Sequence, residues 1–389
     1  MQPVRDWLIV GGIFTAALVV GGALVLRPMG IGRGPAVTNV KATRLMTMPT
    51  SIADVGMGSS AYQWLDSKTV LIHDRIEDYT VDVATGARST PSWITQAQKK
   101  FGGKKTSTGF YGWVLSPDRK WAVASVSLMT DQSPAKLPMM LAGRMDPGGG
   151  TPSTHGVPAF PAQGGRWLLA RVDGTAIVDI GAAKDLLDIP VWHPDSKGWF
   201  EVDQSSAEAS TVSEWTISGG KVTRKTVESV AQMSPMTVIG AVSNKSVLTM
   251  AGGDEDDGED DSDSEQTMPY NVIHFEKGKE VVDTTYKYPF GLVSIPLGHE
   301  LSPDATRIAW DNASARGGLG GMLLQSAVMH KSPYNMELKV GNLDGSRMRV
   351  LVTEPMEGQY AGPISIRWMP DGKHVSYVDM GGLWSVPVD

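Results

Sequence analysis

The feature that most constrains the fold is a short unit that recurs along the chain. It consists of a hydrophobic strand, a turn of the form x-Pro-Asp-x-Lys, and a second strand of alternating character. Proline presets the backbone for the first corner of such a turn, and the aspartate carboxylate accepts hydrogen bonds from the following amides. A turn of this kind joins two antiparallel strands. Six stretches fit, beginning at Tyr62, Trp113, Val191, Ala241, Glu300 and Ile366, and those at Tyr62 and Ala241 lack the Pro-Asp pair.

A second pair of strands follows most of these hairpins, so each unit has four strands. The clearest second pairs are residues 79–88, 214–224, 271–281 and 338–348. Four-stranded units repeated around an axis are typical of a β-propeller, in which neighbouring blades bury each other's faces. The sequence therefore predicts an all-β fold, a six-bladed propeller of four-stranded blades over residues 37–389. The repeats are longer than the roughly 40–45 residues of a plain blade, which predicts insertions at about residues 130–165, 252–267 and 312–332.

The two ends of the repeat region are complementary. The last unit stops after Trp384-Ser-Val-Pro-Val without a fourth strand, whereas Val40-Lys-Ala-Thr-Arg-Leu-Met46 precedes the first unit and looks like the outer strand of other blades. We predict that this N-terminal strand completes the last blade and closes the ring.

An uncharged apolar stretch precedes the repeats. Residues 7–26 contain no charged side chain and are long enough, as a helix, to cross a hydrocarbon core of about 30 Å. We expect an uncleaved transmembrane anchor here, after a short tail of residues 1–6 and before a linker of residues 27–36. A cleaved signal peptide is the alternative. Positive charges at Arg27 and Arg33 would favour a cytoplasmic propeller, whereas a terminal signal anchor would export it. The expected location is the cytoplasmic (inner) membrane, with an extracytoplasmic propeller.

The Ser-Pro-Asp turn at residues 302–304 and the Pro-Asp-Gly-Lys turn at residues 370–373 resemble the TolB-like propeller repeat, a bacterial relative of WD repeats. The resemblance covers about residues 37–389. It implies a propeller fold, and it leaves open an interaction platform, a solute-binding sensor or a domain attached to an enzyme.

Composition excludes several classes of site and partner. The chain has no cysteine, which excludes disulfides, thiolate metal sites and cysteine nucleophiles. Its 35 Lys and Arg residues against 42 Asp and Glu residues argue against a general nucleic-acid binder. Much of the acidity lies in residues 254–265, for which we weigh a solvated loop, a docking segment for a basic partner and a calcium site. The Met- and Pro-rich residues 130–165 are either a mobile loop or a partner contact.

No local motif predicts catalysis. The sequence contains neither a His-Glu-x-x-His zinc motif nor a Gly-x-Ser-x-Gly nucleophile elbow. We therefore name no catalytic residue, no metal ligand and no cofactor, and the binding residues stay unknown. Most tryptophans fall at or near expected strands, so we interpret them as packing between blades. They include Trp64, Trp113, Trp121, Trp192, Trp199, Trp215, Trp310, Trp368 and Trp384.

The function that these observations favour is a membrane-anchored propeller that binds a protein or a small ligand through its loops, in the bacterial cell envelope and without catalysis. The alternatives are a hydrolase or lyase with its site in the central channel, or a ligand-sensing subunit of a membrane complex. A polar, convergent channel would favour the enzyme or the sensor, and a plugged channel with exposed apolar loops would favour the platform.

Overall fold

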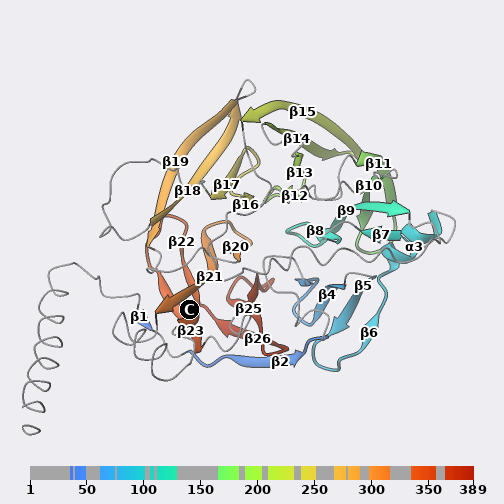
Figure 1. The fold of residues 1–389 in the computed structure, drawn as a ribbon. Helices are drawn as coiled ribbons and strands as arrows, with labels where there is room; N and C mark the ends of the chain where they lie inside the picture. The colour runs from blue at the N-terminus through green and yellow to red at the C-terminus, as the bar shows by residue number, and fades with distance from the viewer. Residues whose placement is uncertain are drawn as a thin grey trace, which may run out of the picture.

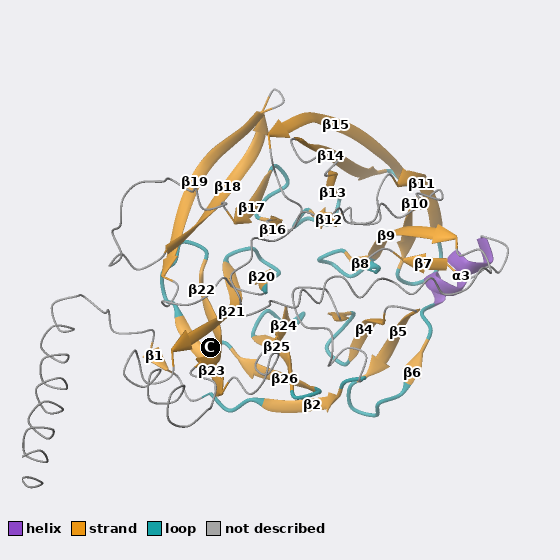
Figure 2. Cartoon of the chain, in the orientation of Figure 1, coloured by secondary structure: helices purple, strands orange, loops and turns teal. Residues whose placement is uncertain are grey.

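The repeats fold into six sheets arranged around a common axis (Figure 1). The computed structural model describes residues 36–37, 40–49, 62–74, 77–100, 106–108, 112–128, 165–183, 189–203, 209–231, 238–250, 267–276, 279–289, 298–315, 334–355 and 364–389. Strands dominate this part of the chain, as Figure 2 shows. The prediction of an all-β propeller with six four-stranded blades is confirmed.

Each of blades 1 to 4 uses consecutive strands, from the axis outward. Blade 1 consists of β3 (Tyr62–Trp64), β4 (Thr69–Asp74), β5 (Glu77–Asp82) and β6 (Arg88–Ser89). Blade 2 consists of β7 (Thr106–Thr108), β8 (Val114–Leu115), β9 (Trp121–Leu128), β10 (Gly165–Arg171) and β11 (Ile177–Ala183). Blade 3 consists of β12 (Ile189–Trp192), β13 (Gly198–Asp203), β14 (Ala209–Ser218) and β15 (Lys221–Ala231).

The second half of the ring repeats this order. Blade 4 consists of β16 (Val238–Ala241), β17 (Ser246–Met250), β18 (Thr267–Glu276) and β19 (Lys279–Pro289). Blade 5 consists of β20 (His299–Leu301), β21 (Arg307–Ala315), β22 (Tyr334–Asn342) and β23 (Arg349–Pro355), with β1 (Ala36–Val37) parallel to β23 at its edge. Blade 6 consists of β24 (Ile364–Trp368), β25 (His374–Asp379), β26 (Gly382–Pro387) and β2 (Thr43–Thr47).

The pairing of β2 with β26 closes the ring. The strands are antiparallel, with Thr43 opposite Ser385 and Thr47 opposite Gly382. Met48, which follows β2, is 4% exposed and packs in the core shared by blades 1 and 6. The predicted closure by the segment from Val40 to Met46 is confirmed, because its residues supply the outer strand of the last blade.

Hydrophobic packing between blades holds the ring together. Six buried clusters occupy the six interfaces between neighbouring blades. Between blades 2 and 3, Trp199 and Trp215 stack at 5.3 Å between ring centroids and share their cluster with Trp167. The prediction that the tryptophans pack between blades is thus confirmed for most of them, whereas Trp121 and Trp384 are only partly buried.

Three features of the described chain were not predicted, among them the pairing of β1 with β23. The helix α3 (Ser92–Lys100) follows blade 1 and buries Trp93, Ile94 and Ala97 in the cluster between blades 1 and 2. The inner edge of blade 2 is divided, because β7 and β8 pair with different parts of β9.

The predicted anchor lies outside the described residues. In the part of the chain that the structure describes, no helix is long and apolar enough to cross a membrane. Residues 7–26, and almost all of the predicted insertions, are not among the described residues. At the insertion edges that are described, β21 continues through Ala315, and β10 and β18 begin at Gly165 and Thr267.

Candidate functional site

The inner strands share one equivalent position, which faces the next blade. In every blade, one inner-strand residue pairs with the third residue of the second strand. These six residues are Gln63, Val114, Val191, Gly240, Glu300 and Arg367. The polar members belong to blades 5, 6 and 1, which are neighbours in the ring, and the apolar members belong to blades 2, 3 and 4. At this position the contact with the next blade is therefore polar in blades 5, 6 and 1 and apolar in blades 2, 3 and 4.

The polar members tie each blade to the next. The Gln63 amide accepts a hydrogen bond from the Leu115 amide at 2.9 Å and donates one to the Trp113 carbonyl at 2.7 Å. Both partners are backbone groups of blade 2. A buried backbone group needs such a partner, so Gln63 satisfies two groups that the short strand β8 leaves unpaired on its inner side.

Glu300 and Arg367 also form hydrogen bonds with backbone groups of the next blade. One carboxylate oxygen of Glu300 accepts a hydrogen bond from the Trp368 amide of blade 6. Arg367 donates from Nη1 to the carbonyl of Ile366 at 2.8 Å and from Nε to the carbonyl of Tyr62 in blade 1 at 3.1 Å. The Arg367 Nε lies 3.9 Å from the other Glu300 oxygen. These two charged side chains are therefore held by backbone groups as well as by each other.

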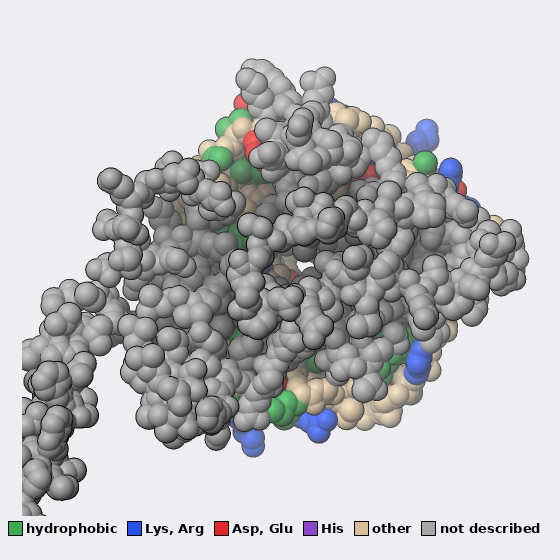
Figure 3. All heavy atoms as spheres, in the orientation of Figure 1, with side chains coloured by type: hydrophobic (Ala, Val, Ile, Leu, Met, Phe, Trp, Pro, Cys, Tyr) green, Lys and Arg blue, Asp and Glu red, His purple; other side chains and the backbone are tan. Residues whose placement is uncertain are grey.

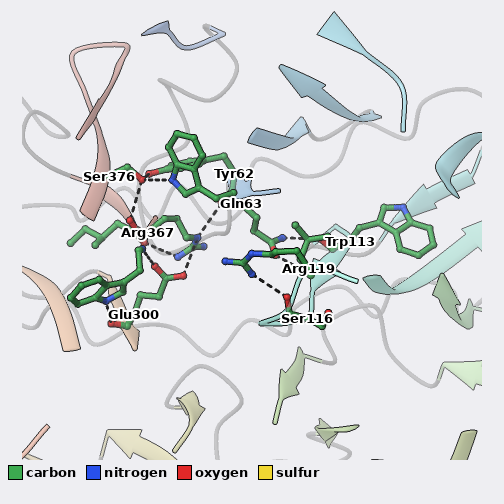
Figure 4. Close-up of polar contacts among 12 residues, drawn as sticks. Tyr62, Gln63, Trp113, Ser116, Arg119, Glu300, Arg367 and Ser376 are labelled. Carbon is green, nitrogen blue, oxygen red and sulfur yellow. Dashed lines mark hydrogen bonds and ion pairs between the residues drawn. The ribbon is translucent and has the colours of Figure 1, made fainter. Parts of the chain in front are cut away.

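A second cation reaches the axis from the Pro-Asp turn of blade 2. The Arg119 guanidinium points toward the space that Glu300, Arg367 and Gln63 surround (Figure 4). Its Nη1 donates to the Ser116 carbonyl of its own turn at 3.2 Å. Its Nε is buried and has no hydrogen-bond partner among the described residues.

Burial dominates the electrostatics of this cluster. It raises the pKa of Glu300, and the neighbouring Arg367, the Trp368 amide and Arg119 each counteract part of that rise. Burial also lowers the pKa of Arg119, which Glu300 partly offsets. The Glu300 side chain nevertheless keeps 29% of its surface accessible. Glu300 is therefore both desolvated and partly accessible, and the space-filling view shows a small gap between atoms near the centre of the ring (Figure 3).

Arg119 occupies an unusual backbone position. The residue after aspartate is left-handed in all four Pro-Asp turns, with φ values of 59° for Arg119, 60° for Ser196, 55° for Ala305 and 63° for Gly372. Its amide closes the turn onto the carbonyl three residues earlier, at 2.8 to 3.0 Å. The three other turns carry small residues there, as the sequence predicted, and blade 2 carries a long charged one.

None of the four residues Gln63, Arg119, Glu300 and Arg367 was predicted from the sequence as a site residue. Aligning the six repeats would have revealed them, because Glu300 and Arg367 stand at a position where other repeats have Val or Gly, and Arg119 stands where they have Ser, Ala or Gly. The histidines do not form a metal centre in the described part of the chain, where no three His, Asp or Glu side chains gather. His73, for example, contacts Asp78 at 2.5 Å within blade 1.

No protein-family model and no curated protein matches the chain. Solved propeller structures do match. A putative TolB from Agrobacterium tumefaciens is 11% identical with a TM-score of 0.38, over 90% of this chain and 99% of that chain. In fold, the chain is similar to TolB.

Two further matches agree with this likeness. TolB from Acinetobacter baumannii is 14% identical with a TM-score of 0.30, over 84% of this chain and 78% of that chain. The propeller domain of the Trilobed protease from Pyrococcus furiosus is 12% identical with a TM-score of 0.40, over 86% of this chain and 83% of that chain. At such identities the likeness concerns the fold alone, and the function has to be argued from the site.

Proposed function

We propose that the chain is a ligand-binding propeller, anchored in the cytoplasmic (inner) membrane through residues 7–26, with the propeller on the outer side. The observation that carries the proposal is the convergence of Gln63, Arg119, Glu300 and Arg367 from four blades on one axial space. Burying charged groups is costly, so a ring otherwise packed with Trp, Val and Leu gains nothing for its stability from adding a second cation here. A concave space with a few convergent polar groups is the usual form of a small-ligand site.

The same cluster favours binding over catalysis. General acid–base chemistry uses two groups whose pKa values are separated by their surroundings. Among the described axial residues Glu300 is the only carboxylate, and one of its oxygens is occupied by the Trp368 amide. The raised pKa of Glu300 is the one observation that favours a hydrolase or lyase, because a protonated carboxyl can act as an acid.

Strand order supports a second contact surface for a protein partner. Residues 130–165, 252–267 and 312–332 span the connections from β9 to β10, from β17 to β18 and from β21 to β22. Each connection joins the second and third strands of a blade, and antiparallel strands alternate in direction. All three therefore start from the end of the propeller opposite the Pro-Asp turns. A membrane-anchored propeller with a ligand on its axis and a protein partner at this end would have the arrangement expected of a sensing subunit.

Membrane topology is tested by cysteine labelling, since the natural chain has no cysteine. Ser262→Cys in intact cells should react rapidly with a membrane-impermeant maleimide. Val247→Cys is the control, because Val247 is 0% exposed and should react only after unfolding. Labelling of Ser262→Cys only after lysis would place the propeller in the cytoplasm and overturn this part of the proposal.

Ligand binding is tested by thermal unfolding of the purified full-length chain in detergent against a library of polar metabolites. We expect at least one compound class to raise Tm, since a ligand that binds only the folded state stabilises it. Glu300→Gln should alter that rise, because Gln can still accept from the Trp368 amide while the axial charge changes. If no compound raises Tm, axial ligand binding is refuted. A rise that Glu300→Gln leaves unchanged would place the ligand elsewhere.

A further inference from the structure

Arg119 is the one axial residue that the architecture of the ring does not explain. Gln63, Glu300 and Arg367 each bond to backbone groups of the next blade. Arg119 bonds to the carbonyl of its own turn, through Ser116, and its Nε is buried with no hydrogen-bond partner among the described residues. A buried guanidinium nitrogen without a partner is unfavourable, because it has lost water and gained nothing in return.

The backbone adds a second cost. A left-handed residue with a side chain is strained by roughly 1–2 kcal/mol relative to ordinary helical geometry, and glycine avoids that strain. Ser196, Ala305 and Gly372 show that small residues satisfy the same turn. Blade 2 therefore keeps a long charged side chain at a position where a small residue satisfies the turn.

The charges of Arg119, Arg367 and Glu300 indicate which kind of ligand the site would bind. Arg119 and Arg367 contribute two positive charges, and Glu300 contributes one negative charge. The remaining positive charge matches a monoanion, whereas a phosphate dianion would place excess negative charge beside Glu300. Arg367 already uses Nε and Nη1 on backbone carbonyls, whereas Arg119 uses only Nη1, so Arg119 keeps more donors for a ligand. A planar guanidinium suits a carboxylate, which it can bind with two parallel hydrogen bonds.

We propose that the axial space binds the carboxylate of a small monoanionic ligand, and that Arg119 is the residue that anchors it. This inference rests on the proposed ligand-binding function and specifies its ligand class. The polar side chains of blades 5, 6 and 1 surround the charged end of the ligand.

The test uses the full-length chain in detergent and three monocarboxylates: acetate, butyrate and benzoate. The matched probes are acetamide, butyramide and benzamide, which keep the shape and lose the charge, and inorganic phosphate at the same ionic strength. We expect at least one carboxylate to raise Tm and to show ligand-observed saturation transfer, and its amide to do neither. Arg119→Gly should weaken that binding by about 10- to 100-fold, as expected for losing hydrogen bonds between charged groups.

Arg347→Gly is the matched control. Arg347 is also left-handed, with φ 54°, but it is exposed in the turn between β22 and β23. Both variants remove the same side chain from the same backbone conformation, so both should unfold at the natural Tm or above it. Arg347→Gly should keep the natural affinity for the carboxylate. Arg119→Lys, which keeps the charge and loses the planar fork, should bind more weakly than the natural protein.

The outcomes separate this inference from the proposed function. Equal carboxylate affinity in Arg119→Gly and the natural chain would overturn the role of Arg119 while leaving ligand binding intact. Binding of phosphate or of the amides in preference to the carboxylates would overturn the ligand class and keep the axial site. If none of these probes binds but the metabolite library contains a ligand, the inference fails and the proposed function stands.

Discussion

Glu201 gives the sharpest prediction about stability, because one buried carboxylate serves three donors. Its side chain is 2% exposed. Oε1 accepts from the Trp167 indole of blade 2 at 3.0 Å, and Oε2 accepts from the Trp215 indole at 2.7 Å and from Arg224 at 2.9 Å, both in blade 3. Glu201→Gln keeps the size of the side chain and leaves a single oxygen for these donors.

The cost follows from counting donors and acceptors. The new amide nitrogen must face at least one indole N–H, which leaves a buried donor unsatisfied at about 1–3 kcal/mol. Losing the ion pair with Arg224 adds roughly 1 kcal/mol, discounted because Arg224 is 29% exposed. The expected loss is about 2–4 kcal/mol. With about 2.1 cal/mol/K of unfolding entropy per residue, a propeller of this size should lose about 3–5 °C in Tm.

Calorimetry or circular dichroism on the purified chain measures this difference. Glu276→Gln is the control, because the Glu276 side chain is 58% exposed and lies 3.9 Å from His274. That control should change Tm by less than about 1 °C. A Glu201→Gln variant that melts with the control would refute the donor count.

Three more predictions follow from the described contacts. Thr43 and Ser385 are directly opposed in β2 and β26, so the double variant Thr43→Cys, Ser385→Cys should form a disulfide that raises Tm. A reductant should reverse the rise. Absence of the cross-link under oxidising conditions would contradict the closure. Asp371→Ala should lower Tm by the equivalent of about 1 kcal/mol, because the carboxylate accepts from two amides of its turn, and an unchanged Tm would contradict that role. Burial lowers the pKa of His299 to about 4 from 6.5, so the folded state resists its protonation and stability should fall as pH drops from 6.5 to 4. His299→Gln should flatten that fall by up to about 3 kcal/mol, measured as the difference from the natural chain, and parallel pH profiles would refute it.

The turns show why so much of the fold was predictable. Proline and aspartate act on their own neighbours, so a Pro-Asp pair specifies a hairpin without reference to the rest of the chain. The closing strand was predictable for a different reason, since a strand that completes the last blade covers its exposed edge. The segment Val40–Met46 is an extra strand at one end of the repeats, and the unit that contains Trp384 lacks a strand at the other end. Pairing the two predicts the closure.

The helix α3 and the axial site depend on contacts that local sequence does not encode. In α3 only Trp93, Ile94 and Ala97 are buried, which is too few positions to distinguish a short helix from irregular chain. The strand β1 is shorter still, and its partner β23 lies far away in sequence.

Glu300 and Arg119 illustrate the same limit for function. Each is an ordinary surface-type residue in its own repeat, and only the ring brings them to one axis from blades 5 and 2. A comparison of repeats would have shown that they differ from their counterparts, but not that they face each other. The geometry of the closed ring was needed for that.

The closure has a consequence for how the protein is made. The strand β2 emerges from the ribosome long before β26, its partner in the ring. At about 5–20 residues per second, the interval amounts to roughly 20–70 s. During that time β2 has no strand to pair with and blade 6 does not exist, so the nascent ring stays open at one interface. The ring can therefore close only when β26 meets the much earlier strand β2, and until then the axial cluster is incomplete.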